Sequence, residues 1–279
     1  MLFGGSDSAG ERSDTWEWNG SAWAELKASG PSARVLAGAG TLANRFFLFG
    51  GMANPSPTGF ADTWEWDGGS WIQRNVAGPS GRWCSSMAPL RGKLVLFGGY
   101  NGRDYLGDTW DWDGNTWAEH KVPGPPARCF HSSVTLGGKV LIFGGQNESG
   151  IRGDLWEWDG SSWTERQSSP APAPRNSAAM AVLGDKVVLF GGSSLGQVFA
   201  DTWEWDGSAW KERPVTGPSA RTGAEMAALN AKLVLFGGNI NRGPQFIYFS
   251  DTWEWNGDRW SELNVKGPSA RTNPAMGER

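Results

Sequence analysis

Cysteine and histidine are both scarce in this chain of 279 residues, with two of each. Cys84 and Cys129 stand one position out of phase in two similar segments, so their side chains are expected on opposite faces of equivalent strands. A disulfide is therefore not expected, and two free, largely buried thiols are. The two histidines, His120 and His131, are too few for the paired ligands of a copper radical oxidase.

An excess of basic residues and a long apolar run are also missing. The net charge is -4 and no basic cluster interrupts the chain, which disfavours a nucleic-acid partner. No apolar stretch reaches the length of a membrane span, and the first residues do not form a signal peptide. We therefore expect no membrane association and a cytoplasmic location by default, with secretion open if a leader has been removed.

What the chain has in abundance is glycine and tryptophan, 41 and 19 residues. Eighteen of the tryptophans occupy three fixed positions of a motif of the form Asp-Thr-Trp-Glu-Trp-Asp-Gly followed by a third Trp. The motif stands at residues 14–20, 62–68, 108–114, 154–160, 201–207 and 251–257. A disordered low-complexity chain would be poor in aromatic residues, so a folded repeat is indicated.

Each repeat contains the signals of four strands. An apolar run ends in Gly-Gly, and these pairs recur about 46–48 residues apart. A loop of variable length follows, then the Trp-rich strand, a hairpin at Asp-Gly or Asn-Gly, and an outer strand with the third Trp. A connector of the type Gly-Pro-Ser-Ala-Arg leads to a strand of small residues, and the Glu204 series of the Trp-rich strand is expected to meet polar groups of the adjoining unit.

Four strands per repeat predict one blade of a β-propeller. The C-terminal residues 271–276 match residues 221–226, while the chain starts inside the second strand of a repeat. We therefore predict an all-β, six-bladed propeller spanning 1–279 as one domain, in which the C-terminal strand completes the N-terminal blade. A fragment of a longer open array is the alternative, but it would leave strand edges exposed.

In these features the chain resembles the Kelch-repeat family of β-propellers. The marks are the Gly-Gly doublet after an apolar strand, the aromatic strand after a variable loop, the later Trp, and the Arg that opens the next blade. The resemblance implies that the loops after Gly-Gly and the Arg connectors share one face, where many Kelch domains bind partners. It also implies a ring of arginines near the channel mouth, equivalent to those that bind acidic peptides in some members: Arg34, Arg82, Arg128, Arg175, Arg221 and Arg271.

Two interpretations of these arginines remain open. A guanidinium group can bind the carboxylates of an acidic ligand. Alternatively, each arginine pairs with the aspartate that opens the Trp-rich motif, and the presence of both residues in every repeat favours this structural role.

Residues that break the repeat are better candidates for function. Trp83 is the one tryptophan outside the three repeated positions, and it either forms a ligand platform or packs against its neighbour. Phe130 and His131 break the pattern in the next repeat, and Tyr100 and Tyr105 lie in a variable loop. With the arginines, these five are the expected ligand contacts. Further unrepeated aromatics of the variable loops are expected on the same face: Phe60, Phe199, Phe246, Tyr248 and Phe249.

The favoured function is a non-catalytic recognition module that binds an acidic peptide, a protein or a glycan. We expect it to act as a monomer and to need no cofactor or metal. The alternative is a sugar epimerase or mutarotase, a reaction that some Kelch proteins catalyse, with His131 and Glu225 as weak acid–base candidates. These two residues stand about two blades apart. A third alternative is a purely structural propeller.

Overall fold

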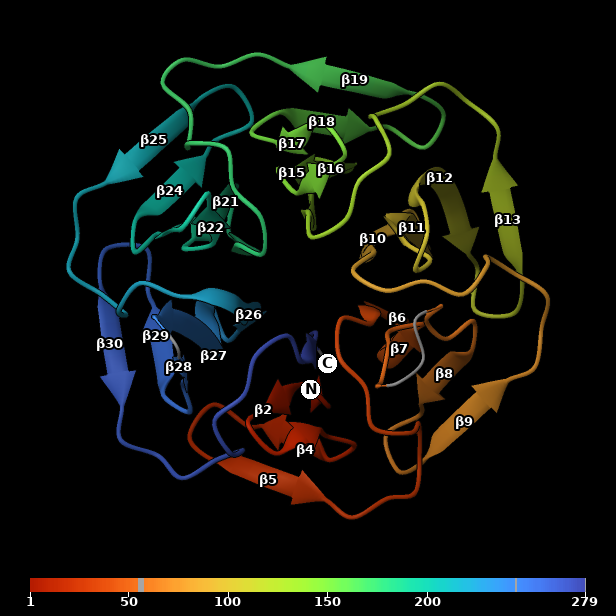
Figure 1. Ribbon diagram of the computed structural model, residues 1–279, viewed down its shortest axis with the longest axis horizontal. Helices are drawn as coiled ribbons and strands as arrows, with labels where there is room; N and C mark the ends of the chain where they lie inside the picture. The colour runs from red at the N-terminus through yellow and green to blue at the C-terminus, as the bar shows by residue number, and fades with distance from the viewer. Residues whose placement is uncertain (55–57, 244, 279) are drawn as a thin grey trace.

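Six four-stranded antiparallel sheets surround a central axis like the blades of a propeller (Figure 1). The computed structural model describes residues 1–54, 58–243 and 245–278, and within these ranges it contains strands and turns without any helix. Accordingly, the described residues include no helix of the length and apolar character that crossing a membrane requires. The predicted all-β, six-bladed propeller is confirmed.

Each blade runs from an innermost strand at the axis to an outermost strand at the perimeter. Blade 1 consists of β31 (Ala275–Met276), β1 (Leu2–Phe3), β4 (Thr15–Trp18) and β5 (Trp23–Leu26). Blade 2 consists of β6 (Gly38–Leu42), β7 (Arg45–Phe49), β8 (Thr63–Trp66) and β9 (Trp71–Arg74). Blade 3 consists of β10 (Ser86–Leu90), β11 (Lys93–Tyr100), β12 (Tyr105–Trp112) and β13 (Trp117–His120).

The remaining three blades repeat this order. Blade 4 consists of β14 (Ser132–Leu136), β15 (Lys139–Phe143), β18 (Leu155–Trp158) and β19 (Trp163–Arg166). Blade 5 consists of β20 (Ala179–Leu183), β21 (Lys186–Phe190), β24 (Thr202–Trp205) and β25 (Trp210–Arg213). Blade 6 consists of β26 (Thr222–Leu229), β27 (Lys232–Arg242), β29 (Thr252–Trp255) and β30 (Trp260–Leu263).

The ring closes by joining the two ends of the chain in blade 1. Strand β31 pairs with β1 in the register Leu2 with Met276 and Phe3 with Ala275. Both termini consequently lie near the centre of the ring (Figure 1). The predicted splice is confirmed, and it removes the open edge that an unclosed array of blades would expose.

The hydrophobic core lies between neighbouring blades. The second strand of each blade is almost fully buried, as in β15, where Val140, Leu141, Ile142 and Phe143 are at most 2% exposed. The indole N–H of the third Trp donates to a Thr hydroxyl of the preceding blade; Trp71, for example, lies 2.9 Å from Thr15. Such a bond links neighbouring blades at five of the six boundaries. It does not form between blades 4 and 5, where Leu155 stands in place of the Thr.

In blades 2 to 6 the acidic residue in the middle of the Trp-rich strand finds partners within its own blade. Glu204 pairs with Lys186 of β21 at 3.1 Å and with Arg213 of β25 at 3.0 Å. The expectation that this series meets the adjoining blade is therefore wrong for these five blades. Since these carboxylates lie on the third of four strands, the bases of the second and fourth strands are the nearest partners.

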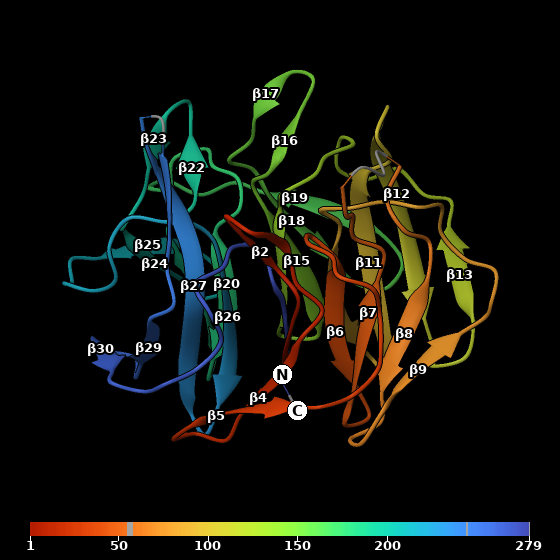
Figure 2. The same cartoon turned by 60° about the horizontal axis from the view of Figure 1, so that its bottom comes forward.

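Hairpins rise from one face of the ring, as the side view shows (Figure 2). They follow the Gly-Gly pairs and comprise β2 (Ser6–Asp7) with β3 (Gly10–Glu11), β16 (Gln146–Asn147) with β17 (Gly150–Ile151), and β22 (Ser193–Ser194) with β23 (Gln197–Val198). In blades 3 and 6 the strands themselves extend into this face, with β28 (Gln245–Tyr248) pairing to β27. We call this side the hairpin face.

Candidate functional site

The six connector arginines are buried inside the hairpin face. Each is at most 2% exposed and forms a two-pronged ion pair with the aspartate that opens the Trp-rich strand of its own blade. In blade 2, Arg34 donates to both carboxylate oxygens of Asp62 at 2.6 and 2.9 Å, to the Gly50 carbonyl, and to the carbonyl and hydroxyl oxygens of Ser32. All five of its N–H donors are thus engaged.

Three phenylalanines of the variable loops cover these arginines. The guanidinium carbons of Arg34, Arg175 and Arg221 lie 3.9–4.1 Å from the ring centres of Phe60, Phe199 and Phe249, respectively. The aspartates also accept the indole N–H of the first Trp of each motif, as Asp201 does from Trp203 at 2.8 Å. Of the two interpretations of the connector arginines, the structure therefore shows pairing with the aspartates. None of these six guanidinium groups is presented to solvent.

The second residue after each arginine belongs to a closed ring of backbone hydrogen bonds around the axis. We call these residues the collar: Leu36, Cys84, Phe130, Ser177, Gly223 and Asn273. Each N–H donates to the collar carbonyl of the preceding blade at 2.8–3.3 Å, and the bond from Leu36 to Asn273 completes the circle. The collar therefore ties all six blades together at the channel mouth.

All six collar residues have positive φ, between 49° and 65°. Glycine adopts this backbone conformation freely, but other residues are strained there by about 1–2 kcal/mol, and five of the six are not glycine. This turn also overturns the expectation that Cys84 and Cys129 face opposite ways. Both thiols are buried and free, and burial, followed by a hydrogen bond with Cys129, raises the pKa of Cys84.

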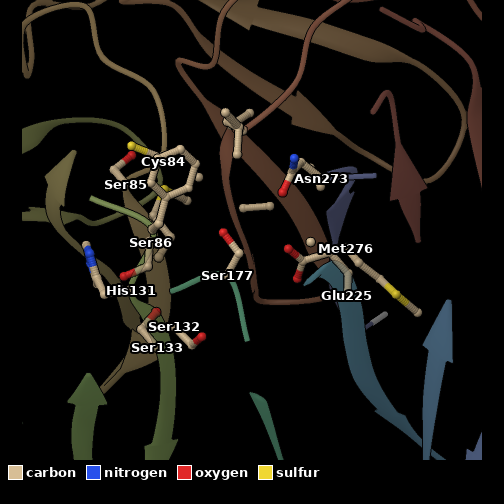
Figure 3. A pocket seen from close by; sticks show the side chains of 18 of the residues that line it. Cys84, Ser85, Ser86, His131, Ser132, Ser133, Ser177, Glu225, Asn273 and Met276 are labelled. Carbon is tan, nitrogen blue, oxygen red and sulfur yellow. The ribbon is translucent and has the colours of Figure 1, made fainter. Parts of the chain in front are cut away.

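A cavity of about 160 Å³ occupies the axis beside and below the collar. It is lined by residues of all six blades, and Figure 3 shows the side chains that reach it. The lining combines small residues with several hydroxyl groups, among them Ser85, Ser86 and Ser177. The hydroxyl oxygens of Ser85 and Ser86 are buried and have no hydrogen-bond partner among the described residues, so this region contains polar atoms that the fold itself does not satisfy.

The aromatic residues that break the repeat come together on one side of the mouth. Trp83 pairs with Tyr100 through two backbone hydrogen bonds of 2.9 and 3.0 Å, and their rings meet edge to face at 5.1 Å. Trp83 also contacts Phe130 at 5.9 Å, and Tyr100 contacts Tyr105 at 5.0 Å. We call these four residues the aromatic half of the mouth. All four are partly exposed, and the indole N–H of Trp83 has no partner in the described part of the chain.

Amide and hydroxyl side chains occupy the other side of the mouth. Asn176 donates to the Gln146 amide oxygen at 2.8 Å and accepts from the Ser193 hydroxyl at 2.8 Å. The Thr272 hydroxyl lies 3.4 Å from the Asn239 amide oxygen. With Thr222 these residues form the polar half of the mouth. Tyr105 interacts with Gln146 and so joins the aromatic half to the polar half. Burial raises the pKa of Tyr105, although this hydrogen bond acts in the opposite direction.

His131 does not take part in this surface. Its side chain is 6% exposed, and its ring packs edge-on against Phe97 of the neighbouring blade at 5.4 Å. The imidazole points away from the middle of the cavity (Figure 3). Burial, followed by the positive charge of Arg128, lowers the pKa of His131 to about 3, so the imidazole is neutral.

Glu225 lies across the cavity from His131 on β26, and its carboxylate points toward the middle of the space (Figure 3). Burial raises the pKa of Glu225 to about 8. The equivalent positions of the other blades carry Gly38, Ser86, Ser132, Ala179 and Ala275. Glu225 is thus the one acidic side chain in the cavity lining, and it forms no hydrogen bond or ion pair with any described residue.

The geometry gives the acid–base alternative little support. His131 and Glu225 line the same cavity, but the imidazole is turned between two blades and away from the carboxylate. His120 lies on the outer strand β13, where its Nε2 is 2.8 Å from Asp111. Among the described residues, no group of three or more His, Cys, Asp or Glu side chains is arranged to hold a metal ion.

The hairpin face has a second apolar region, in which Phe246 was identified from the sequence but neither Leu195 nor the groove beside it was. Leu195, at the tip of the β22–β23 hairpin, is 94% exposed, and Phe246 on β28 is 57% exposed. Between these two hairpins lies a groove of about 430 Å³ that includes Phe246 and Val198. The unusual length of the last variable loop could have pointed to this region, since long loops in compact domains are often functional.

Comparison with known proteins agrees with the architecture. The model of the KLHDC2/KLHL20/DRC7 Kelch-repeats domain matches residues 113–276, more than half of the chain, and the Kelch motif matches residues 81–126. A search of curated proteins finds no match. The chain therefore belongs to the Kelch-repeat family, whose propeller fold supports a non-catalytic scaffold for protein interaction.

Proposed function

We propose that this protein is a recognition module that binds a peptide or protein segment across the channel mouth of the hairpin face. The observation that carries the proposal is the aromatic half, in which Trp83, Tyr100, Tyr105 and Phe130 form one continuous group of partly exposed rings. Aromatic residues gathered in a concave site are typical anchors of binding energy.

The polar half supplies the complementary chemistry. Its amide and hydroxyl groups can pair with the backbone of a bound segment while the aromatic rings pack against its side chains. The ring of arginines is not part of this proposal, because their donors are engaged by aspartates, carbonyls and hydroxyls beneath the surface. Recognition of an acidic segment would therefore need donors other than these arginines.

A glycan is the second candidate ligand. It is favoured by the neighbouring aromatic and amide groups, since a partly exposed Trp or Tyr ring offers an apolar face beside a polar edge. Both candidates use the same four rings, so one set of variants tests them together.

The test is selection from a random peptide library and binding to a glycan array, followed by affinity measurement with variants. Trp83→Thr introduces the residue that two other blades carry at this position, and it is expected to weaken a selected ligand at least about tenfold, as the loss of an aromatic anchor does. Ile72→Thr, at an exposed position of the outer strand β9, is the control and should bind as wild type. Ligands that bind wild type and Trp83→Thr equally would place recognition elsewhere on the protein.

A further inference from the structure

The cavity beneath the collar contains one carboxyl group and no ammonium or guanidinium group among its described lining residues. Its described lining has no Lys or Arg, and its titratable side chains are Cys84, His131 and Glu225. The Cys84 thiol and the His131 imidazole are both neutral near pH 7, because burial shifts the pKa of the thiol up and that of the imidazole down. The Glu225 carboxylate therefore has no counter-charge within the cavity.

Two further oxygen atoms face the same space from the neighbouring blades. Figure 3 shows the amide of Asn273 and the hydroxyl of Ser177 around the space that the Glu225 carboxylate enters. None of these three side chains forms a hydrogen bond with a described residue. Three oxygen atoms from blades 5, 6 and 1 thus face the same space, and no lysine or arginine of the described lining reaches it.

Gly223, the one glycine of the collar, stands two residues before Glu225 on β26. A Cβ at Gly223 would clash with the Thr272 hydroxyl and lie 2.5 Å from the Asn273 amide oxygen, so these two side chains fill the space beside the glycine. The Asn273 amide is therefore packed against the strand that carries Glu225.

From this arrangement we infer that the axial cavity is a binding site for an organic cation, a primary ammonium or guanidinium group, held by Glu225 with Asn273 and Ser177. An ammonium group has three donors and no acceptor, which matches three converging oxygens. A cavity of about 160 Å³ exceeds the volume of a few waters, about 30 Å³ each, and suits the end of an alkylammonium chain. Leu36 and Phe130 of the collar provide apolar contact for its methylene groups.

Binding of a cation requires the ionised form of Glu225. Burial alone holds the pKa of this carboxyl near 8 in the free protein, so a bound cation lowers that pKa and releases a proton. Below this pKa the affinity is expected to rise with pH, by up to about tenfold per unit. Neither Cys84 nor His131 contributes to this dependence near neutrality, since both stay uncharged.

The direct test is calorimetric titration with n-butylammonium and with n-butanol, its neutral counterpart, above and below pH 8. We expect saturable binding of n-butylammonium, at least about tenfold weaker binding of n-butanol, and a loss of at least about tenfold in Glu225→Gln. Glu225→Ala, which restores the residue of blades 5 and 1, should behave like Glu225→Gln. Glu262→Gln, on the exposed outer strand β30, is the charge-matched control and should bind as wild type.

Equal affinity of wild type and Glu225→Gln, or no saturable binding to wild type above pH 8, would overturn the inference. The source of the cation is distinguished by a second comparison. A lysine-containing peptide that binds at least about tenfold more tightly than n-butylammonium identifies a partner's side chain, and equal affinity identifies a free amine. The inference does not rest on the surface proposed above, because Trp83→Thr should retain n-butylammonium even where it loses the peptide ligand.

Discussion

The outer part of each blade and the lining of the channel differ in how their polar groups are satisfied. In the outer part, which we call the frame, arginine, aspartate, threonine and the first and third tryptophans recur in nearly every blade and bind one another. The indole N–H of the second tryptophan is the exception, since in all six blades it is buried without a partner among the described residues. In the channel lining, the residues at several equivalent positions change from blade to blade, and Ser85, Ser86 and Glu225 have no partner among the described residues. Repetition therefore marks the groups that hold the ring together, and variation marks those free to meet a ligand.

The largest expected effect comes from breaking the frame. Asp201→Ala would leave the Arg175 guanidinium, 1% exposed, without its carboxylate and would remove the acceptor of the Trp203 indole. We expect a loss of about 3–5 kcal/mol in the free energy of unfolding, measured by urea denaturation. The double variant Arg175→Met with Asp201→Ala should recover part of the loss, since it removes the unpaired charge. A loss below about 1 kcal/mol would mean that the frame does not depend on these pairs.

An opposite and smaller effect is expected in the channel lining. The pKa of Glu225 is raised from 4.5 to about 8 by folding, so the unfolded chain loses this proton first as the pH rises. Stability is therefore fully present below pH 4.5, falls as the pH rises toward 8, and is level above it. A shift of this size corresponds to at most about 5 kcal/mol, and access of water to the channel reduces the expected fall to about 3 kcal/mol.

Glu225→Ala and Glu225→Gln should abolish that fall and make the protein more stable than wild type above pH 8. The check is chemical denaturation at several pH values, with Glu262→Gln as the control that keeps the fall. If the difference between wild type and Glu225→Gln does not change with pH, the carboxyl is not held in its protonated form by folding.

The smallest effect concerns the collar. Ser177 has φ of 49°, and its hydroxyl has no hydrogen bond to a described residue. Ser177→Gly relieves this strain but makes the unfolded chain more flexible, so we expect a net gain of about 0.5 kcal/mol in thermal or urea unfolding. Ser177→Ala, which keeps the strain, is the control and should gain nothing. A loss above about 1 kcal/mol in Ser177→Gly would show that this side chain supports the frame.

The fold was predictable because its signals are local and occur six times. The Gly-Gly pairs, the Trp-rich strands and the hairpin turns each fix a strand or a turn by themselves, and their common spacing fixes the ring. The closure in blade 1 followed from matching residues 271–276 to residues 221–226. The grouping of Trp83 with Tyr100 followed from the resemblance to Kelch propellers, which implies that the arginine connectors and the loops after Gly-Gly share one face.

The channel could not be predicted in the same way. Leu36 and Phe130 seldom adopt positive φ, so residue preferences gave no sign of the left-handed turn that forms the collar. That turn interrupts the alternation of side chains along the strand. The expectation that the side chains of Cys84 and Cys129 point to opposite faces, which assumed this alternation, was therefore wrong. The orientation of His131 depends on how Phe97 of another blade packs against it, which no local pattern contains.

The collar also has a rotational sense. Every one of its six N–H groups points along the circle toward the preceding blade, so none of them is directed into the channel. The backbone therefore sets the diameter of the opening and offers no donor to whatever enters it. Five side chains, with Gly223 in the sixth blade, determine the chemistry of the entrance, and their variety shows that the circle of hydrogen bonds accommodates different residues.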